Sequence, residues 1–344
     1  MTPRETRPQV QANKKFMIPY WWKVVFAFTL GWMFINANKY FLNPILGEIG
    51  LEYDLNNTQL GLVNSIFFLT YTIAQIPAGA FSDKFGRKKL LVTGFILYGI
   101  LTGVSGLMAG FTGFLVARAL AGLSSATYFG PQFALSSEAI PEKNRTVGSA
   151  IINSGSGLGI AFGFILSSTL VLENGMSWSV PFYIFGVLTV LVGILIAAIV
   201  KEKNQDKTLK QSDRLEESST KGEKVSVLSL LKNRNLLITF LVLFCSIYGF
   251  TVVVTWLPKF LETERGFRGT QVGLIAALVP LASIPGALIA SYISDRLGRK
   301  KPFAFVLIPI SAIALWATVY VQDTALLITA LLIYGLFGKR KFAF

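Results

Sequence analysis

The sequence contains no histidine and a single cysteine, Cys245, among its 344 residues. Without histidine, the usual zinc sites and the commonest general base of enzymes are excluded. One cysteine within an apolar run excludes a disulfide framework and a cysteine metal cluster. Charged residues make up 15% of the chain, against 53% hydrophobic residues and a mean hydropathy of +0.57. This balance is too apolar for a soluble protein of this length, and it indicates a membrane protein. We expect no metal and no cofactor.

Ten apolar segments follow one another along the chain, and most of them reach the roughly 20 residues that a helix needs to cross a bilayer. Their approximate bounds are Trp22–Leu46, Leu60–Phe81, Leu90–Ala109, Phe111–Ser136, Val147–Leu172, Val180–Val200, Leu236–Leu261, Val272–Ile293, Phe303–Val321 and Ala325–Gly338. The first segment is too long for a signal peptide, so we expect it to remain as a span. We therefore predict an all-α membrane protein with ten membrane-spanning helices.

The basic residues predict how these helices are oriented. If the N-terminus is cytoplasmic, 27 of the 32 Lys and Arg lie on the cytoplasmic side, three lie outside and two lie within spans. Cytoplasmic loops of multi-pass membrane proteins carry such an excess of cations. The net charge of +14 is therefore a topological signal, and we expect no nucleic-acid partner. We predict a monomer in the lipid bilayer of a cell membrane, the plasma membrane of a bacterium, with both termini cytoplasmic.

One pattern occurs twice at a separation of 212 residues. Thr58–Leu62 reappears as Thr270–Leu274, and Ser82–Lys89 reappears as Ser294–Lys301. Two patches at one offset, each next to an apolar segment, indicate a duplicated membrane unit. We expect a cytoplasmic tail at 1–21, a six-helix half at 22–200, a charged flexible cytoplasmic linker at 201–233 and a four-helix half at 234–344.

The duplicated turns carry glycine, acidic and basic residues at fixed spacing. These are Gly79, Asp83, Gly86, Arg87 and Lys88 in the first half, and Asp295, Gly298, Arg299 and Lys300 in the second, where Ser291 replaces the first glycine. The spacing resembles the cytoplasmic signature G-x-x-x-D-x-x-G-R-[RK] of the major facilitator superfamily. This resemblance implies a bundle of two halves with six helices each. Because four spans follow the linker and the last has 14 residues, we expect a chain without the last two of twelve helices.

In the resembled family, the first turn controls the cytoplasmic side of the protein. Glycine permits close helix approach and a tight reversal, and an aspartate can face the positive N-terminus of a neighbouring helix. The resemblance implies that Asp83 latches the two halves and that Arg87 pairs with Glu138. Glu138 and Arg145 flank the turn into the fifth helix. The simpler alternative is that these charges only hold the turns at the lipid headgroups.

Two cations lie within spans, Lys39 in the first and Arg118 in the fourth. A cation at mid-helix costs roughly 2.5–3.5 kcal/mol on insertion scales, so its presence indicates an aqueous or anionic environment. Each lies about 10 Å below the outer surface, at matching depth. Both belong to polar stripes at helical spacing that include Asn36, Tyr40, Asn43, Gly122, Ser125 and Gln132. The stripes predict an anion site, unless Lys39 extends to the interface and Arg118 bonds to backbone carbonyls.

Within the superfamily, two further segments resemble the anion:cation symporter group, which carries sugar acids and other organic anions. They are Phe68-x-x-Tyr71-x-x-x-Gln75-Ile76-Pro77-x-Gly79 and Thr255-Trp256-Leu257-Pro258. The resemblance implies that Lys39, Arg118 and Tyr71 surround a substrate carboxylate, and we add Gln75 to these candidates. Asn38 and Ser125 stand where some members carry acids for proton coupling.

Acidic residues are absent from the spans, since all 18 fall in loops or at span ends. Uptake of protons needs a titrating group in the cavity, so anion exchange, uniport or sodium coupling gains weight over proton coupling. Asn153–Gly159 in the fifth span suits close helix contact or, as the weaker alternative, sodium binding.

We predict a secondary transporter that moves a small organic anion, such as a sugar acid, by alternating access. No nucleophile lies near a base within a span, so we do not expect an enzyme. The alternatives are a substrate sensor of the same fold, an inactive transporter fragment, or a carrier of sugar phosphates, sugars or drugs.

Overall fold

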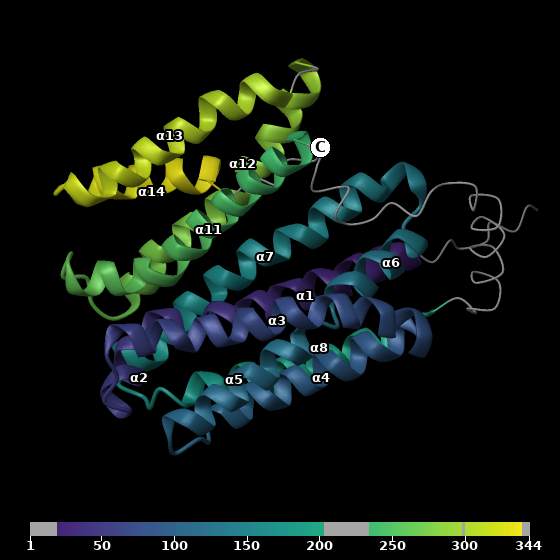
Figure 1. The fold of residues 1–344 in the computed structure, drawn as a ribbon, viewed down its shortest axis with the longest axis horizontal. Helices are drawn as coiled ribbons and strands as arrows, with labels where there is room; N and C mark the ends of the chain where they lie inside the picture. The colour runs from purple at the N-terminus through teal and green to yellow at the C-terminus, as the bar shows by residue number, and fades with distance from the viewer. Residues whose placement is uncertain (1–18, 203–233, 298–299, 339–344) are drawn as a thin grey trace, which may run out of the picture.

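The computed structural model describes residues 19–202, 234–297 and 300–338, and every regular element within these ranges is helical (Figure 1). The longer helices are α1 (Tyr20–Tyr40), α2 (Leu46–Glu52), α3 (Asn57–Phe85), α4 (Arg87–Ser105), α5 (Phe111–Ser125), α6 (Phe129–Ala139), α7 (Arg145–Ser167), α8 (Val180–Ile199), α11 (Arg234–Thr263), α12 (Thr270–Leu297), α13 (Lys300–Tyr320) and α14 (Thr324–Gly338). Short helical turns follow α1, α6 and α7, namely η1 (Asn43–Ile45), η2 (Glu142–Asn144) and the π-helical η3 (Ser168–Glu173). Each predicted span coincides with one helix or with consecutive helices, so the predicted all-α fold is confirmed.

Two predicted spans contain a break that their hydropathy does not indicate. The first span leaves α1 at Tyr40 and continues through η1, which contains Pro44. The fourth span is divided into α5 and α6, and Pro131 lies in the first turn of α6. Proline lacks an N–H and clashes with the preceding turn, so it is tolerated where a helix begins but interrupts one in its interior. Apolar side chains continue through both breaks, which is why the hydropathy pattern alone joins the pieces.

Pairs of helices build the first half: α7 packs against α1, α8 against α4, and α5 against α3. Glycines allow the approach of α7 to α1, because a Cβ at Gly155 would collide with the carbonyl oxygen of Thr29. A Cβ at Gly159 would likewise collide with the carbonyl oxygen of Met33. Small residues let membrane helices approach this closely. The glycine-rich segment of α7 therefore serves helix packing, and it fixes the position of α1.

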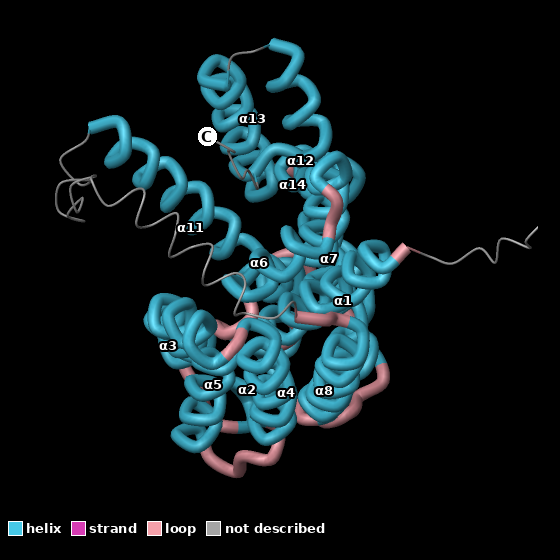
Figure 2. Tube along the Cα trace, turned by 90° about the vertical axis from the view of Figure 1, so that its right-hand side faces the viewer, coloured by secondary structure: helices cyan, strands magenta, loops and turns pink. Residues whose placement is uncertain are grey.

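In the described part of the second half, α14 packs against α12 and α13. This half meets the first mainly where α12 lies along α7, and also where α11 reaches η1. Tyr40 and Phe164 of the first half share an apolar cluster with Phe250 and Val254 of the second. Figure 2 looks toward the end of the bundle at which α3 finishes, and there α11 stands away from α3. The halves are therefore joined more closely at the α2 end of the bundle than at the α3–α4 turn.

Six helical segments are long and apolar enough to cross a membrane: Asn57–Ser82, Arg87–Ser105, Glu142–Glu173, Val180–Ile199, Leu236–Thr263 and Thr270–Ile289. Large apolar side chains such as Phe240 and Phe244 on α11 are exposed, as expected of a surface that faces lipid. α1 is not among the six, since Asn36, Asn38 and Lys39 reduce its hydropathy. All three of these polar side chains are buried, so the polarity of α1 is directed into the protein.

Candidate functional site

Lys39 and Arg118 approach the same helix, α3, from α1 and α5. The Lys39 Nζ lies 3.7 Å from the centre of the Tyr71 ring, and the Arg118 Cζ lies 4.6 Å from the centre of the Phe67 ring. Phe67 and Tyr71 are one helical turn apart, and their rings stack with centres separated by 6.4 Å. A desolvated cation over an aromatic ring gains about 2 kcal/mol. The structure thus places both predicted cations on one aromatic platform, formed by Phe67 and Tyr71.

Neither cation extends to the lipid surface, since Arg118 is 0% exposed and Lys39 is 5% exposed. The Nε, Nη1 and Nη2 atoms of Arg118 are buried, and none has a hydrogen-bond partner among the described residues. Arg118 is therefore not bonded to backbone carbonyls, and Lys39 does not reach the interface. Burial of an ion without partners costs several kcal/mol, and donors left without acceptors add to this penalty. An anion that supplied the missing acceptors would relieve it.

Three of the predicted amide side chains are engaged within the first half. Asn36 Nδ2 donates to the carbonyl oxygen of Trp32 at 2.8 Å. Asn38 Nδ2 donates to a carbonyl of its own helix and to Thr189 Oγ1 of α8, so Asn38 is directed toward α8. Gln132 Oε1 accepts from Trp32 Nε1 at 2.9 Å, and its amide nitrogen donates to a serine hydroxyl on α6. Asn38 therefore joins α1 to α8 and Gln132 joins it to α6, whereas the bond of Asn36 stays within α1.

The remaining predicted binding residues differ in how accessible they are. The Ser125 hydroxyl is buried and donates to the carbonyl oxygen of Gly122 in its own helix, at 2.9 Å. Gln75 lies one turn beyond Tyr71 on α3, and both side chains are partly exposed. The structure thus brings Lys39, Arg118 and Tyr71 together at α3 as the candidate anion site, and Gln75 follows one turn later on the same helix. Asn36, Asn38, Ser125 and Gln132 instead form the hydrogen bonds within the protein that are described above.

Gly86 reverses the chain between α3 and α4. Its φ of +97° lies in the region that favours glycine over every other residue, as the signature requires. Directly after it, Arg87 Nη1 lies 2.7 Å from Glu138 Oε1 of α6, and each side chain is 31% exposed. Arg87 and Glu138 therefore form the ion pair that the family resemblance implies. The control of conformation by this pair stays a prediction.

Glu202 holds the start of α4, a role that the sequence analysis did not find. Its two carboxylate oxygens accept from the backbone N–H groups of Arg87, at 2.8 Å, and Lys88, at 3.3 Å. The first N–H groups of a helix have no partner within the helix, and negative charge is favoured beside them. The contact ties the chain that leaves α8 to the signature turn. The signal in the sequence was one acidic residue just after the sixth span.

The other predicted conformational residues either have few close neighbours or lie outside the part of the chain that the structure describes. Gly79 on α3 has open space beside it, because a Cβ there would meet no atom within 4 Å. Arg145 begins α7 and is exposed. The side chains of Asp83 and Asp295 lie outside the described part of the structure, as do Gly298 and Arg299. The latch at Asp83 and the role of the second signature therefore stay predictions.

Asn43 joins the two halves at the α2 end of the bundle. Pro258 of α11 has no N–H, so the carbonyl of Val254, four residues earlier, lacks its usual helical partner. Asn43 Nδ2 donates to this carbonyl oxygen at 3.1 Å, and Asn43 Oδ1 accepts from Asn64 Nδ2 at 3.0 Å. Asn43 is 1% exposed, so the bond is shielded from water. A proline in one half thus frees the acceptor that binds the other half.

Further polar contacts join the halves at this end. Glu173 Oε2 accepts from the backbone N–H of Thr270 at the start of α12, at 3.1 Å, and the Thr169 and Thr270 hydroxyls are also 3.1 Å apart. Lys259 Nζ donates to Asn57 Oδ1 at 2.7 Å. We call these contacts, together with the hydrogen bond from Asn43 to the Val254 carbonyl, the polar seam.

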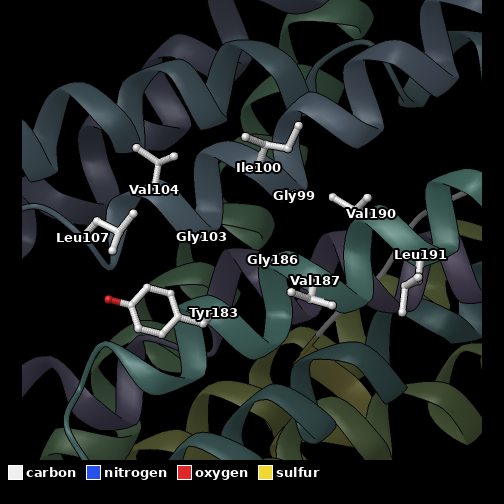
Figure 3. A pocket seen from close by; sticks show the side chains of 10 residues that line it. All are labelled: Gly99, Ile100, Gly103, Val104, Leu107, Tyr183, Gly186, Val187, Val190 and Leu191. Carbon is white, nitrogen blue, oxygen red and sulfur yellow. The ribbon is translucent and has the colours of Figure 1, made fainter.

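An apolar groove of about 420 Å³ runs between α4 and α8 (Figure 3). Its lining contains none of the predicted site residues, and consists of Gly99, Ile100, Gly103, Val104, Leu107, Tyr183, Gly186, Val187, Val190 and Leu191. A Cβ at Gly99 would lie 2.8 Å from the carbonyl oxygen of Gly186, so the glycines here allow close helix contact. Because Ile100, Val187 and Leu191 are exposed, we assign this surface to contact with lipid.

Two helical halves joined at one end, with buried cations among the helices of the first, define a polytopic membrane transporter. The chain belongs to the Major Facilitator Superfamily, which residues 21–338 match. The predicted family is therefore confirmed. Because this is a family of transporters, the expectation that the chain is not an enzyme is confirmed as well.

Curated relatives extend over most of the chain. The cis,cis-muconate transport protein of Acinetobacter baylyi is 28% identical over 320 residues, which cover 91% of this chain and 76% of the relative. The hexuronate transporter of Bacillus subtilis is 26% identical over 251 residues, which cover 72% of this chain and 58% of the relative. Among solved structures, a D-xylose-proton symporter superimposes with a TM-score of 0.75 at 16% identity, over 92% of this chain and 79% of its own. This last likeness concerns the fold alone.

Proposed function

We propose that this protein carries a small organic anion across a membrane by alternating access, with Lys39 and Arg118 binding the substrate carboxylate. The observation that carries the proposal is the set of buried Arg118 donors that have no hydrogen-bond partner among the residues that the structure describes. A carboxylate accepts two parallel hydrogen bonds from a guanidinium, which would satisfy these donors. The Lys39 ammonium on the same aromatic platform adds a second positive charge. Relatives named for muconate and hexuronate transport support an anionic substrate.

We further propose that the polar seam faces the outside of a bacterial plasma membrane. The turn at Lys84–Lys89 is rich in cations and lies at the opposite end of the bundle, which supports a cytoplasmic position for that turn and for both termini. This orientation makes the conformation an inward-facing one, with the seam closing the outer side of the site. The proposed substrate pathway lies within the helices of one chain and needs no second subunit, so we keep the expectation of a monomer.

The residues around the cations argue against coupling to protons. Asn38 and Ser125 are neutral, and each is hydrogen-bonded within the first half. Without an intramembrane carboxylate or histidine, the described site has no group that changes its charge between pH 5 and 8. We therefore propose anion exchange or uniport, with sodium as the remaining candidate for a coupling ion.

Uptake of labelled cis,cis-muconate into proteoliposomes that contain the full chain tests the proposal. We expect saturable uptake that unlabelled muconate inside the vesicles accelerates, because exchange returns the loaded carrier. An ionophore that dissipates a proton gradient should leave the rate unchanged. Lys39→Ala should reduce the rate, since one of the two cations is removed. Absence of saturable uptake would refute transport, whereas uptake that stops with the ionophore would refute only the coupling.

Asn43→Asp is expected to shift the protein toward the state that is open at the α2 end. Aspartate keeps the size of the side chain but has no N–H to donate, so the Val254 carbonyl would lose its partner and face a carboxylate. Loss of a buried hydrogen bond costs about 1–3 kcal/mol, which corresponds to a population shift of about 5- to 150-fold. Distances between spin labels at the α2 ends of the two halves measure the shift without substrate.

Two further variants control this measurement. Asn36→Ala removes an amide whose hydrogen bond stays within α1, and it should leave the distance distribution unchanged. Pro258→Ala supplies an N–H that competes for the Val254 carbonyl, so it should shift the distances in the same direction as Asn43→Asp. If Asn43→Asp left the distances as they are in the unaltered chain, the seam would not hold the outer side closed.

A further inference from the structure

We propose that the anion site selects a carboxylate on a hydroxyl-free carbon skeleton over a polyhydroxylated sugar acid of the same length. This inference rests on the proposed function and narrows its substrate class. It follows from which polar groups around Lys39 and Arg118 are free to bind a substrate, and which are already engaged by the protein.

Most of the amide nitrogens that could donate to sugar hydroxyls are already engaged, whereas the buried carbonyl oxygens of Asn38 and Asn64 have no hydrogen-bond partner among the described residues. Asn36 bonds to its own helix, Asn38 is directed to Thr189, and Gln132 bonds to Trp32. Two further asparagines, Asn43 of η1 and Asn64 of α3, bond to each other. Of the four predicted amides, Gln75 remains as a donor, partly exposed one turn beyond Tyr71, and Asn38 adds one buried acceptor oxygen. The side chain of Gln75 can form hydrogen bonds to two neighbouring hydroxyls, but it cannot bond to all the hydroxyls of a sugar acid.

The spans of the second half are largely apolar in sequence. The spans of the second half at 236–258, 272–293, 303–321 and 325–338 contain no Asn, Gln, Asp, Glu, Lys or Arg. Where this half meets the cation-bearing helix α1, Tyr40 packs with Phe250 and Val254, and its ring lies 5.9 Å from Phe68. The hydroxyl of Ser283, on α12, already donates to a carbonyl of its own helix. This half therefore offers apolar surface, and few hydrogen-bond partners, to a bound molecule.

The free groups and the apolar surface describe a particular ligand. The guanidinium and the ammonium bind carboxylates, while Phe68 and Tyr71, which are partly exposed beside the buried Phe67, offer aromatic surface to a flat, apolar skeleton. A hydroxyl transferred to such a surface loses its water without gaining a partner, which weakens binding roughly tenfold for each one. A skeleton with four hydroxyls should therefore bind about 100-fold more weakly or worse, even if some hydroxyls stay hydrated.

Three six-carbon dicarboxylates test this inference on the full chain in detergent or nanodiscs. cis,cis-Muconate is unsaturated, adipate is saturated and free of hydroxyls, and D-glucarate carries four hydroxyls, while all have a carboxylate at each end. We measure their equilibrium binding by calorimetry, which needs no transport. We expect muconate to bind about 100-fold more tightly than D-glucarate, with adipate closer to muconate.

The outcomes separate this inference from the proposed function. If D-glucarate binds as tightly as muconate, or if adipate binds as weakly as D-glucarate, the site does not select against hydroxyls and the inference is overturned. Arg118→Met should abolish the binding of all three compounds. If all three still bind to this variant, or if none binds to the unaltered chain, the proposed anion site itself fails.

Discussion

Replacement of Arg118 by methionine is expected to reduce anion uptake to the level of empty liposomes, while the thermal stability of the protein stays equal or rises. Methionine has a similar volume and needs no hydrogen-bond acceptors. The guanidinium in this position is 0% exposed and has no hydrogen-bond partner among the described residues. Its contact with Phe67 returns about 2 kcal/mol, which is less than the several kcal/mol that burial of an unpaired ion costs. The stability and the activity should therefore move in opposite directions.

Uptake of labelled muconate and the midpoint of thermal unfolding measure the two effects. Arg118→Lys is the matched control, because it keeps the positive charge but cannot form two parallel bonds to a carboxylate. We expect this variant to retain measurable uptake with weaker apparent affinity. If the Arg118→Met protein transported normally, Arg118 would not bind substrate. If it instead unfolded at a much lower temperature, the arginine would be a structural residue and not a binding residue.

The sequence was sufficient for the fold because membrane helices leave strong signals. A membrane helix satisfies its backbone hydrogen bonds internally, so length and hydropathy identify most of the spans, although the polar residues of α1 lower its hydropathy. The breaks at Pro44 and Pro131 were not predicted, since the apolar pattern continues through them. The capping of α4 by Glu202 was also missed, because an acid after a span has many possible partners until the neighbouring helix is placed.

For the candidate site, the sequence identified the charges but not their surroundings. Lys39 and Arg118 stand out because a cation within a span costs free energy and is therefore rare outside functional sites. Helical spacing placed Asn36 on the stripe of Lys39 and Gln132 on the stripe of Arg118. In the structure, however, both amides bond to Trp32. A stripe defines the direction in which a side chain leaves its helix, but not the atom that it reaches. Phe67, which lies under Arg118, gave no signal at all, since a phenylalanine in a span is ordinary.

The second large effect is expected at Gly159, where substitution by alanine should destabilise the protein severely. In most helices alanine is favoured over glycine by about 1 kcal/mol. At Gly159, however, the added Cβ would collide with the carbonyl oxygen of Met33, and a backbone atom cannot rotate away. α1 and α7 would have to separate, which opens the core around the helix that carries Lys39. We expect a loss of more than about 3 kcal/mol, the upper end for an overpacked core, and little folded protein after extraction.

Gly249→Ala on α11 is the matched control, because a Cβ there would meet no atom within 4 Å. This variant should unfold at the same temperature as the unaltered chain or slightly above it, since only the helix preference changes. Fluorescence-detected size exclusion and thermal unfolding compare the two variants directly. Equal stability of both alanine variants would mean that α1 and α7 are not in close contact. The position of Lys39, and with it the aromatic platform shared by the two cations, would then have to be redrawn.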